Sequence, residues 1–190
     1  VNIPYWGSSG VALDTTTGAP DTAYPKVDGS IYTVAADGSG GWYIAGMFTT
    51  VGGVSRNNLA HILADKSIDP AWNPNFDGPA ITLAVSGSVV YVGGNFTSIG
   101  GQTRNNIAAL DATTGAVTAW NPNSNGVIAT LAVSGSTVYA MGYFTTIGGQ
   151  ARSFIAALDA TTGLATAWNP SSNGQINVVT VSGSTVYAMG

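Results

Sequence analysis

Short apolar segments alternate with turn residues along the whole chain. The clearest unit runs from Asn125 to Ser172 and contains the apolar segments VIATLAV, TVYAMGYF, SFIAALDA and LATAWNP, separated by SGS, TTIGGQAR and TTG. β-Branched and aromatic residues dominate these segments, while Gly, Asn and Pro punctuate them, which predicts four short β-strands. Segments such as IATLAV are apolar at almost every position, so we expect both faces of the sheet to be buried.

This unit repeats every 48 residues, and three kinds of marker share the interval. The markers are Trp72, Trp120 and Trp168; Arg56, Arg104 and Arg152; and the Gly pairs at 52–53, 100–101 and 148–149. A fixed period of this length is the signature of a repeat architecture. It places whole repeats at residues 29–76, 77–124 and 125–172 of a single domain that spans residues 1–190.

An all-β fold, a β-propeller of four-stranded antiparallel blades, fits these repeats best. Each propeller blade packs between two neighbours, which covers both faces of its sheet, and blades of about 40 to 50 residues are usual. A β-solenoid or an irregular sandwich is the alternative. All nine acidic residues are Asp, and because Asp favours turns while Glu favours helices, the acids also indicate a chain without long helices.

The two ends of the chain complement each other. The opening VALDTTTGAPDTAYP, within residues 1–28, matches the last two strands of a repeat, and residues 173–190 match the first two. Together they make a fourth blade split between the termini. We expect this blade to close a ring of four within one chain, because the halves add up to one blade with almost nothing left over.

Two alternatives to this closure stay open. In one, the chain pairs with itself through the split blade, as an eight-bladed dimer or a head-to-tail polymer. In the other, the chain is a fragment whose parent continues with further blades. The start at Val1 instead of Met agrees with a processed or cut chain.

The repeats resemble a known family. The segments GGWYIAGMFTTVGGVSRNNLAHILADKSIDPAWNP and YVGGNFTSIGGQTRNNIAALDATTGAVTAWNP are similar to the bacterial secreted propeller repeats called delta-sixty repeats. The likeness covers nearly all of the chain and includes the run from the aromatic-glycine strand through Gly-Gly and Arg to WNP. It implies a propeller and an extracellular or cell-surface location, and it implies no activity.

A second likeness is to the blades of quinoprotein propellers. The segments ALDATTGAVTAW and ALDATTGLATAW are similar to that pattern, but four residues instead of three separate Gly115 from Trp120. Quinone enzymes also need calcium ligands and a catalytic carboxylate, and no cluster of acids in the sequence suggests either. We therefore interpret the shared part as blade architecture.

Charge excludes several classes of partner. Charged residues make up 7% of the chain and the formal net charge is −4. The negative charge is spread over isolated Asp residues, and the sequence has no basic patch for phosphates, which argues against nucleic acid as a partner. The stretch from Ala112 to Ala151 carries no charge, but its Gly, Ser, Thr, Asn and Pro content excludes a membrane-spanning helix. Without Cys, neither a disulfide nor a thiolate metal site can form.

The repeated markers have structural and functional interpretations. Trp72, Trp120 and Trp168 could form an aromatic surface for sugars, but we expect residues that recur once per blade to be wedges between blades. The three Arg residues could bind anions, yet each follows a Gly-Gly loop, which favours a brace to loop carbonyls. Asp111 and Asp159 begin DATTG turns, where a carboxylate accepts backbone N–H bonds, and one carboxylate per loop is too few for calcium. We predict no metal and no cofactor.

His61 is the one residue that a catalytic account would choose first. It is the only histidine, and Ala109 and Ala157 occupy its place in the next repeats. We expect a packing variant instead of a catalytic base, because no nucleophile motif accompanies it. No catalytic residue is assigned. Separately, Ser124 is expected at the surface.

The sequence thus predicts a non-catalytic extracellular module with a structural, adhesion or assembly role. Low charge and few Lys or Arg residues suit a surface exposed to proteases. One alternative is a lectin-like propeller that binds an extracellular glycan or protein. The other is a propeller enzyme, either a hydrolase, a lyase or a quinoprotein.

Overall fold

The computed structural model describes residues 12–190, and all the regular structure in this range is β. Each whole repeat begins with a long antiparallel hairpin. These hairpins are β1 (Val27–Ala36) with β2 (Trp42–Val51), β5 (Ala80–Ser86) with β6 (Val89–Gly94), and β10 (Ile128–Ser134) with β11 (Thr137–Gly142). A last hairpin joins β15 (Val178–Ser182) to β16 (Thr185–Met189). The expectation of an all-β fold with antiparallel strands is confirmed.

A third strand completes the sheet of each whole repeat. These strands are β4 (Leu59–Ile62), β9 (Ile107–Asp111) and β14 (Ile155–Asp159), and each pairs with the second strand of its hairpin. We call the sheet of β1–β4 the first sheet, that of β5, β6 and β9 the second, and that of β10, β11 and β14 the third.

The Gly-Gly loops that precede the third strands form small ladders of their own. These ladders pair β3 (Val54–Ser55) with the end of β2, β7 (Ser98–Ile99) with β8 (Gln102–Thr103), and β12 (Thr146–Ile147) with β13 (Gln150–Ala151).

The fourth strand that the sequence predicts in each repeat is reduced to a single bridge. Val117 bridges to Leu110 and Ala165 to Leu158, and the chain then leaves the sheet. In both repeats the backbone N–H of the tryptophan turns back to a threonine hydroxyl, from Trp120 to Thr118 and from Trp168 to Thr166. Pro122, two residues after Trp120, has no N–H with which to continue a ladder.

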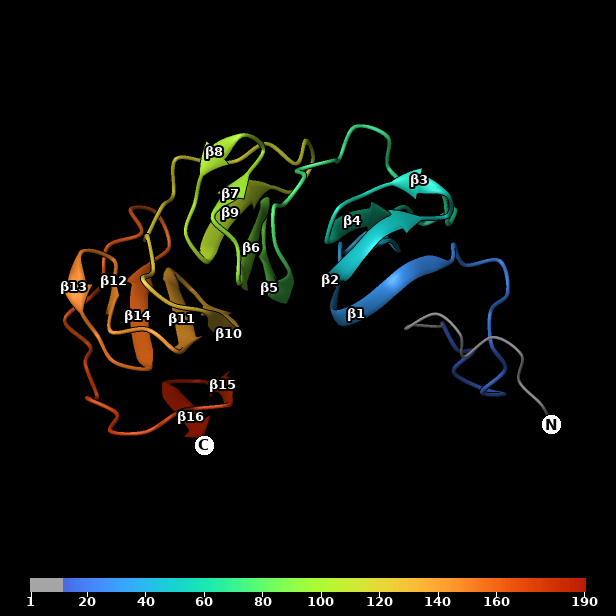
Figure 1. The fold of residues 1–190 in the computed structure, drawn as a ribbon. Coiled ribbons are helices and arrows are strands. Elements are labelled where there is room, and N and C mark those ends of the chain that lie inside the picture. Colours follow the sequence, from blue (N-terminus) through green and yellow to red (C-terminus); the bar gives the residue numbers. More distant parts are fainter. Residues whose placement is uncertain (1–11) are drawn as a thin grey trace.

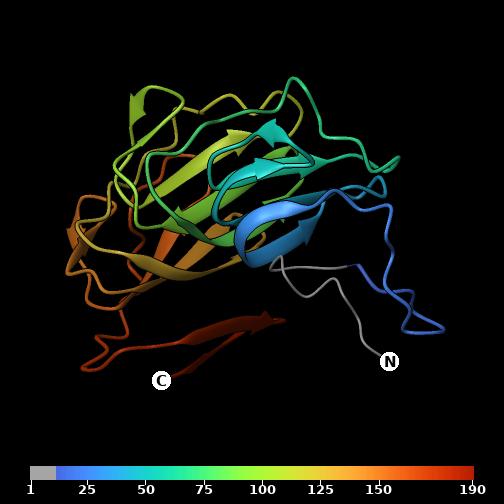
Figure 2. The ribbon, with the colours of Figure 1, turned by 45° about the vertical axis from the view of Figure 1, so that its right-hand side comes forward.

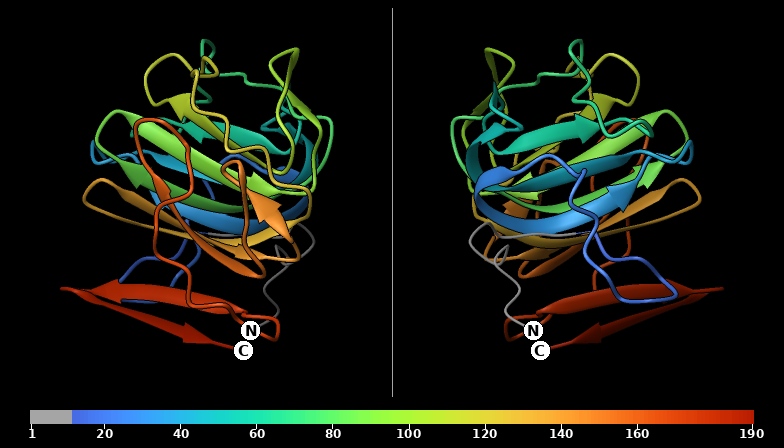
Figure 3. Two further views of the ribbon diagram at one scale, coloured as in Figure 1. Left: turned by 90° about the vertical axis from the view of Figure 1, so that its left-hand side faces the viewer. Right: turned by 90° about the vertical axis from the view of Figure 1, so that its right-hand side faces the viewer.

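The sheets follow one another in an open arc (Figure 1). Their first strands, β1, β5, β10 and β15, are neighbours in that order. Seen from the side, the sheets stack, and the β15–β16 hairpin forms an outer layer of the stack (Figure 3). Residues 12–26, which we call the N-terminal segment, lie beyond the first sheet and apart from this hairpin (Figures 1 and 2). Among residues 12–190 no strand pairing or hydrogen bond joins these two halves of the split blade, so ring closure stays a prediction. Residues 1–11 of the expected N-terminal half-repeat lie outside the described range.

The core lies between successive sheets, in interfaces that we call joints. The first joint, between the first and second sheets, buries Trp72 completely, and the second joint, between the second and third, leaves Trp120 only 5% exposed. Each indole Nε1 donates to a backbone carbonyl 39 residues further along, with N···O distances of 3.2 Å to Asp111 and 2.9 Å to Asp159. A tryptophan therefore both fills the joint and ties one repeat to the turn of the next.

A tyrosine accompanies each tryptophan. Tyr43 donates its hydroxyl to the Ala112 carbonyl across the first joint, and Tyr91 donates to the Ala160 carbonyl across the second. Trp168 occupies the same repeat position as Trp72 and Trp120 but is 37% exposed, because no complete sheet follows the third. Its ring contacts Tyr139 at 5.5 Å between centroids.

Replacement of Trp120 by Ala should lower the free energy of unfolding by about 3–5 kcal/mol, because a buried ring is lost and a cavity remains. Urea unfolding measures the effect. The matched control is Trp168→Ala, which removes the same side chain from the same repeat position where it is partly exposed, and it should cost clearly less.

Equal losses from the two substitutions would contradict the assignment of Trp120 as the centre of a joint. Ser124 is unsuitable as a surface control, contrary to the expectation from the sequence. It is 1% exposed, and its hydroxyl donates to the Gly126 carbonyl at 2.7 Å.

Candidate functional site

The three repeat arginines turn inward to backbone carbonyls. Their terminal nitrogens donate to two carbonyls each, at 2.7 to 2.8 Å: Arg56 to Ser55 and Asp69, Arg104 to Thr103 and Thr118, and Arg152 to Ala151 and Thr166. The Nε atom of each is buried without a hydrogen-bond partner. The guanidinium groups thus tie the Gly-Gly loops to the segments that lead to the tryptophans.

The aspartates of the DATTG turns are engaged in the same local way. Oδ1 of Asp111 accepts bonds from the backbone N–H groups of Thr113 and Thr114 and from the Thr114 hydroxyl. These bonds, with the Thr114 hydroxyl first, lower the pKa of Asp111. Asp159 has equivalent partners, with the Thr162 N–H as the main cause of its lowered pKa. Residues 12–190 contain no group of three or more His, Cys, Asp or Glu side chains suited to a metal ion.

One polar cluster is buried in the first joint, and the sequence analysis missed it. His61, on β4, has its Nδ1 2.9 Å from Oδ2 of Asp69 and its Nε2 3.1 Å from Oδ2 of Asp37. The ring stacks on Tyr43, with centroids 4.4 Å apart, and meets the edge of Trp72. Each ring nitrogen thus lies within hydrogen-bond distance of a different carboxylate.

The carboxylate of Asp37 is held in its ionised form. Burial opposes this ionisation, but hydrogen bonds from Ser39, His61 and Gly41 outweigh it and lower the pKa of Asp37 to about 2. The Ser39 hydroxyl donates to Asp37 and not to His61. The cluster therefore lacks the nucleophile-to-base hydrogen bond of a catalytic relay, and its place under Trp72 makes it part of the joint.

A signal for this cluster exists in the sequence. His61 replaces the Ala109 and Ala157 of the next repeats. Asp69 lies one residue out of the 48-residue register and takes the structural place of Thr118 and Thr166, as the shared carbonyl bonds of the arginines show. His61 and Asp69 both differ from the residues of the other repeats, and both lie in the first repeat. Two such substitutions in one repeat can be partners in space. The expectation that His61 is a mere packing variant overlooked its two acidic partners.

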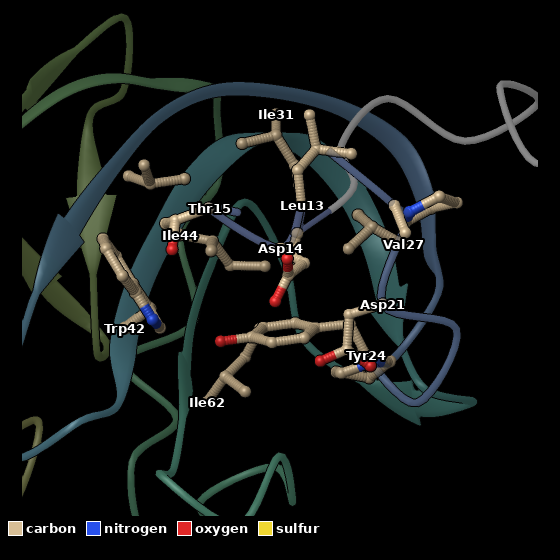
Figure 4. Close-up of a pocket in the computed structure, with 15 residues that line it drawn as sticks. Leu13, Asp14, Thr15, Asp21, Tyr24, Val27, Ile31, Trp42, Ile44 and Ile62 are labelled. Atoms are coloured by element: carbon tan, nitrogen blue, oxygen red, sulfur yellow. The ribbon is translucent and has the colours of Figure 1, made fainter. Parts of the chain in front are cut away.

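The described structure also has a pocket of about 740 Å³ at one end of the arc. It lies between the N-terminal segment and the first sheet, and Figure 4 shows Tyr24 and Asp14 reaching into it from the segment. Ile31, Ile44 and Trp42 contribute the opposite, apolar wall.

This wall occupies repeat positions that are covered elsewhere. Val34 stands opposite Ile44 as Leu83 stands opposite Val92, and Leu131 has the same place in the third sheet. Val34 is 53% exposed, whereas Leu83 and Leu131 are each 8% exposed. The pocket is thus the open half of a joint.

Comparison with known proteins agrees with a propeller. The family model for "Domain of unknown function (DUF5122) beta-propeller" matches residues 38–71 and 87–115, in the first and second repeats. Together with the antiparallel all-β sheets, this match supports the β-propeller class that the sequence predicts. The narrower likeness to delta-sixty repeats and the number of blades stay predictions.

The chain was also compared with solved structures and with curated proteins. The computationally designed Ika8 protein is a similar solved structure, with 12% identity and a TM-score of 0.44, over 95% of this chain and 74% of that chain. A search of curated proteins finds no match. Within residues 12–190, no helix has the length and apolar character needed to cross a membrane.

The substitution His61→Ala should lower the free energy of unfolding by about 1–3 kcal/mol, because it leaves two largely buried carboxylates without their shared hydrogen-bond partner. A triple variant that adds Asp37→Asn and Asp69→Thr should recover much of this loss. Thr is the residue of the other repeats, where Thr118 Oγ1 accepts the Trp120 N–H. Urea midpoints of the single and triple variants decide the matter, and a triple variant less stable than the single one would contradict this interpretation.

Acid should remove the contribution of Asp37 to stability. Its folded pKa of about 2 lies below the ordinary value of 3.8, so its stabilising effect is complete above that ordinary value and is lost as the pH falls through about 2. The stability difference between the wild type and Asp37→Asn should be constant near neutral pH and shrink as the pH approaches 2, as measured by urea unfolding. A difference that does not change with pH would contradict this assignment.

Proposed function

We propose that the chain is a non-catalytic structural module of an extracellular assembly, joined to other modules through its two ends. The observation that carries this proposal is that exposed apolar side chains lie at both ends of the arc. Leu13, Val34 and Trp42 are exposed at one end of the arc, and Trp168, Tyr187 and Met189 at the other. Exposed apolar surface of this kind marks an interaction site.

The C-terminal hairpin has one covered face and one open face. Val179 packs on Met141 and Ile155 of the third sheet, and Val186 and Ile176 lie against the same cluster. Because side chains alternate along a strand, the next residues point the other way. These are Val178 and Tyr187, which are exposed together with Met189. The open face therefore has the apolar character of a joint without a partner.

Polar groups support a structural role in place of catalysis. The arginines bind loop carbonyls, the turn aspartates cap their own turns, and His61 is held between two carboxylates. A catalytic acid, base or nucleophile has to face the substrate. The pocket is the apolar hollow that a small ligand would choose, but its wall consists of joint positions, which favours a protein surface as occupant.

Composition supports an extracellular location. Only 7% of the residues are charged, and the chain has two Lys and three Arg residues. Proteases with trypsin-like specificity cut after Lys and Arg, so few such sites suit an exposed environment. The likeness to secreted propeller repeats points the same way.

Light scattering on the purified chain tests the assembly role. The wild type should be heavier than a 19.1 kDa monomer at micromolar concentration, where interfaces of moderate affinity are occupied. Trp42→Glu at one end and Tyr187→Glu at the other should each shift the population to the monomer, because a charge cannot be buried in an apolar joint without a partner.

The matched control is Met47→Glu, which places the same charge on an exposed apolar residue of the first sheet that does not line the pocket. It should leave the mass distribution unchanged, and circular dichroism should show the same β-structure in all three variants. A wild type that stays monomeric over the whole concentration range would overturn the proposed function.

A further inference from the structure

We propose that the β15–β16 hairpin of one copy and the N-terminal segment of a second copy form one sheet, which fills the pocket beside the first sheet of that second copy. This inference rests on the proposed function, since it names the partner as a second copy of this chain and the contact as a completed blade. Four observations carry it: the strand register, two unpaired hydrogen-bond donors, the open pocket and the separation of the ends.

The internal repeats supply the register. In the third sheet, β11 pairs with β14, with Thr137 opposite Asp159 and Val138 opposite Leu158. The equivalent residues of the hairpin are Thr185 and Val186, and those of the N-terminal segment are Asp14 and Leu13. The outer edge of β16 has no partner strand within residues 12–190. An unpaired edge of this kind is a template for another strand.

The N-terminal segment already has the local structure of the missing strands. Leu13 bridges to Pro20 as Leu158 bridges to Ala165. Oδ1 of Asp14 accepts bonds from the N–H groups of Thr16 and Thr17, the pattern of the turns at Asp111 and Asp159. The segment therefore presents a preformed outer half-blade.

Two donors at the C-terminal end lack acceptors. In the first joint, Trp72 donates to the Asp111 carbonyl and Tyr43 to the Ala112 carbonyl. Their counterparts beyond the third sheet, Trp168 Nε1 and the Tyr139 hydroxyl, have no hydrogen-bond partner within residues 12–190. The equivalent acceptors are the carbonyls of Asp14 and Thr15, which the turn of the N-terminal segment presents in the same arrangement.

The pocket wall and the open face of the β15–β16 hairpin are both apolar and exposed. Its wall includes Trp42, which is exposed, whereas Val90 and Val138 at the same repeat position are fully buried by the preceding sheet. In the second joint, Tyr91 of the preceding sheet belongs to the same core cluster as Val138. Its equivalent in the hairpin is Tyr187, which is exposed. The hairpin thus supplies the apolar groups that the pocket lacks.

A second copy fits better than the other end of the same chain. The hairpin and the N-terminal segment lie at opposite ends of the arc, apart from one another (Figures 1 and 2). Both halves are already docked on their own neighbours, the hairpin through Val179 on the third sheet and the segment through the Lys66–Asp21 ion pair of 2.7 Å. A head-to-tail contact between copies uses both halves where they lie, as a heterologous interface does.

Cysteine cross-linking tests the register and the source of the partner strand. The chain has no Cys, so a Leu13→Cys/Val186→Cys variant contains a single pair of thiols, which directly opposite strand positions bring to about 5 Å between Cβ atoms. A short bis-maleimide should join these thiols between chains, giving covalent dimers or larger species on a denaturing gel. Leu13→Cys/Thr180→Cys is the control, because Thr180 lies on β15, with β16 between it and the proposed contact.

Each outcome decides the inference. An internal link within a monomer would overturn it in favour of ring closure within one chain, and a yield no higher than that of the control would overturn the register. If the wild type still assembles in light scattering, either failure leaves the proposed function standing.

A mixing experiment gives a second decision without thiols. Trp42→Glu chains keep an intact C-terminal half, and Tyr187→Glu chains keep an intact N-terminal half. Each alone should be monomeric, and the mixture should form a one-to-one complex. A mixture that remains monomeric, when the wild type assembles, would overturn the head-to-tail contact.

Discussion

The fold depends on one interaction between successive repeats, the insertion of a tryptophan into the joint with its indole N–H bound to a carbonyl of the following repeat. Trp72 and Trp120 bury large rings where two sheets face one another, and each finds its acceptor 39 residues further along. The acceptor belongs to the aspartate that opens the DATTG turn. The indole hydrogen bond therefore fixes the position of the turn, the packing of the ring and the spacing of the sheets together. This explains why the tryptophans recur at a constant interval of 48 residues.

The remaining polar residues of the repeat support this contact. Each arginine ties a Gly-Gly loop to the residue just before the tryptophan segment, and each turn aspartate fixes the loop whose carbonyl accepts the indole N–H. The first joint differs in its use of His61 between two carboxylates, stacked on Tyr43 and under Trp72. There a charged cluster takes the place of the alanines of the other repeats, and burial makes each member depend on the others.

Much of this could be predicted from the sequence, because it repeats. The interval of 48 residues identified the equivalent tryptophans, arginines and aspartates, and the apolar strands indicated sheets covered on both faces. The fourth strand could not be predicted correctly, since LATAW has a strand pattern but forms only one bridge, and the Trp168 backbone N–H turns back to the Thr166 hydroxyl. The His61 cluster was missed because its members come from positions 24 and 8 residues away, and their proximity depends on how the first sheet folds.

The ends of the chain follow from the same interaction. A joint needs a tryptophan ring from one repeat and a turn carbonyl from the next. In an open array of such repeats, the indole N–H therefore lacks its acceptor at one end, and the turn carbonyl lacks its donor at the other. Exposed apolar side chains lie at both ends of the described structure, with Val34 and Trp42 at one end and Tyr187 and Met189 at the other. Because each end has what the other lacks, the chemistry that holds the repeats together within the chain is also available between chains. The stability of the isolated chain and its tendency to assemble should therefore vary together when a joint position is changed in every repeat.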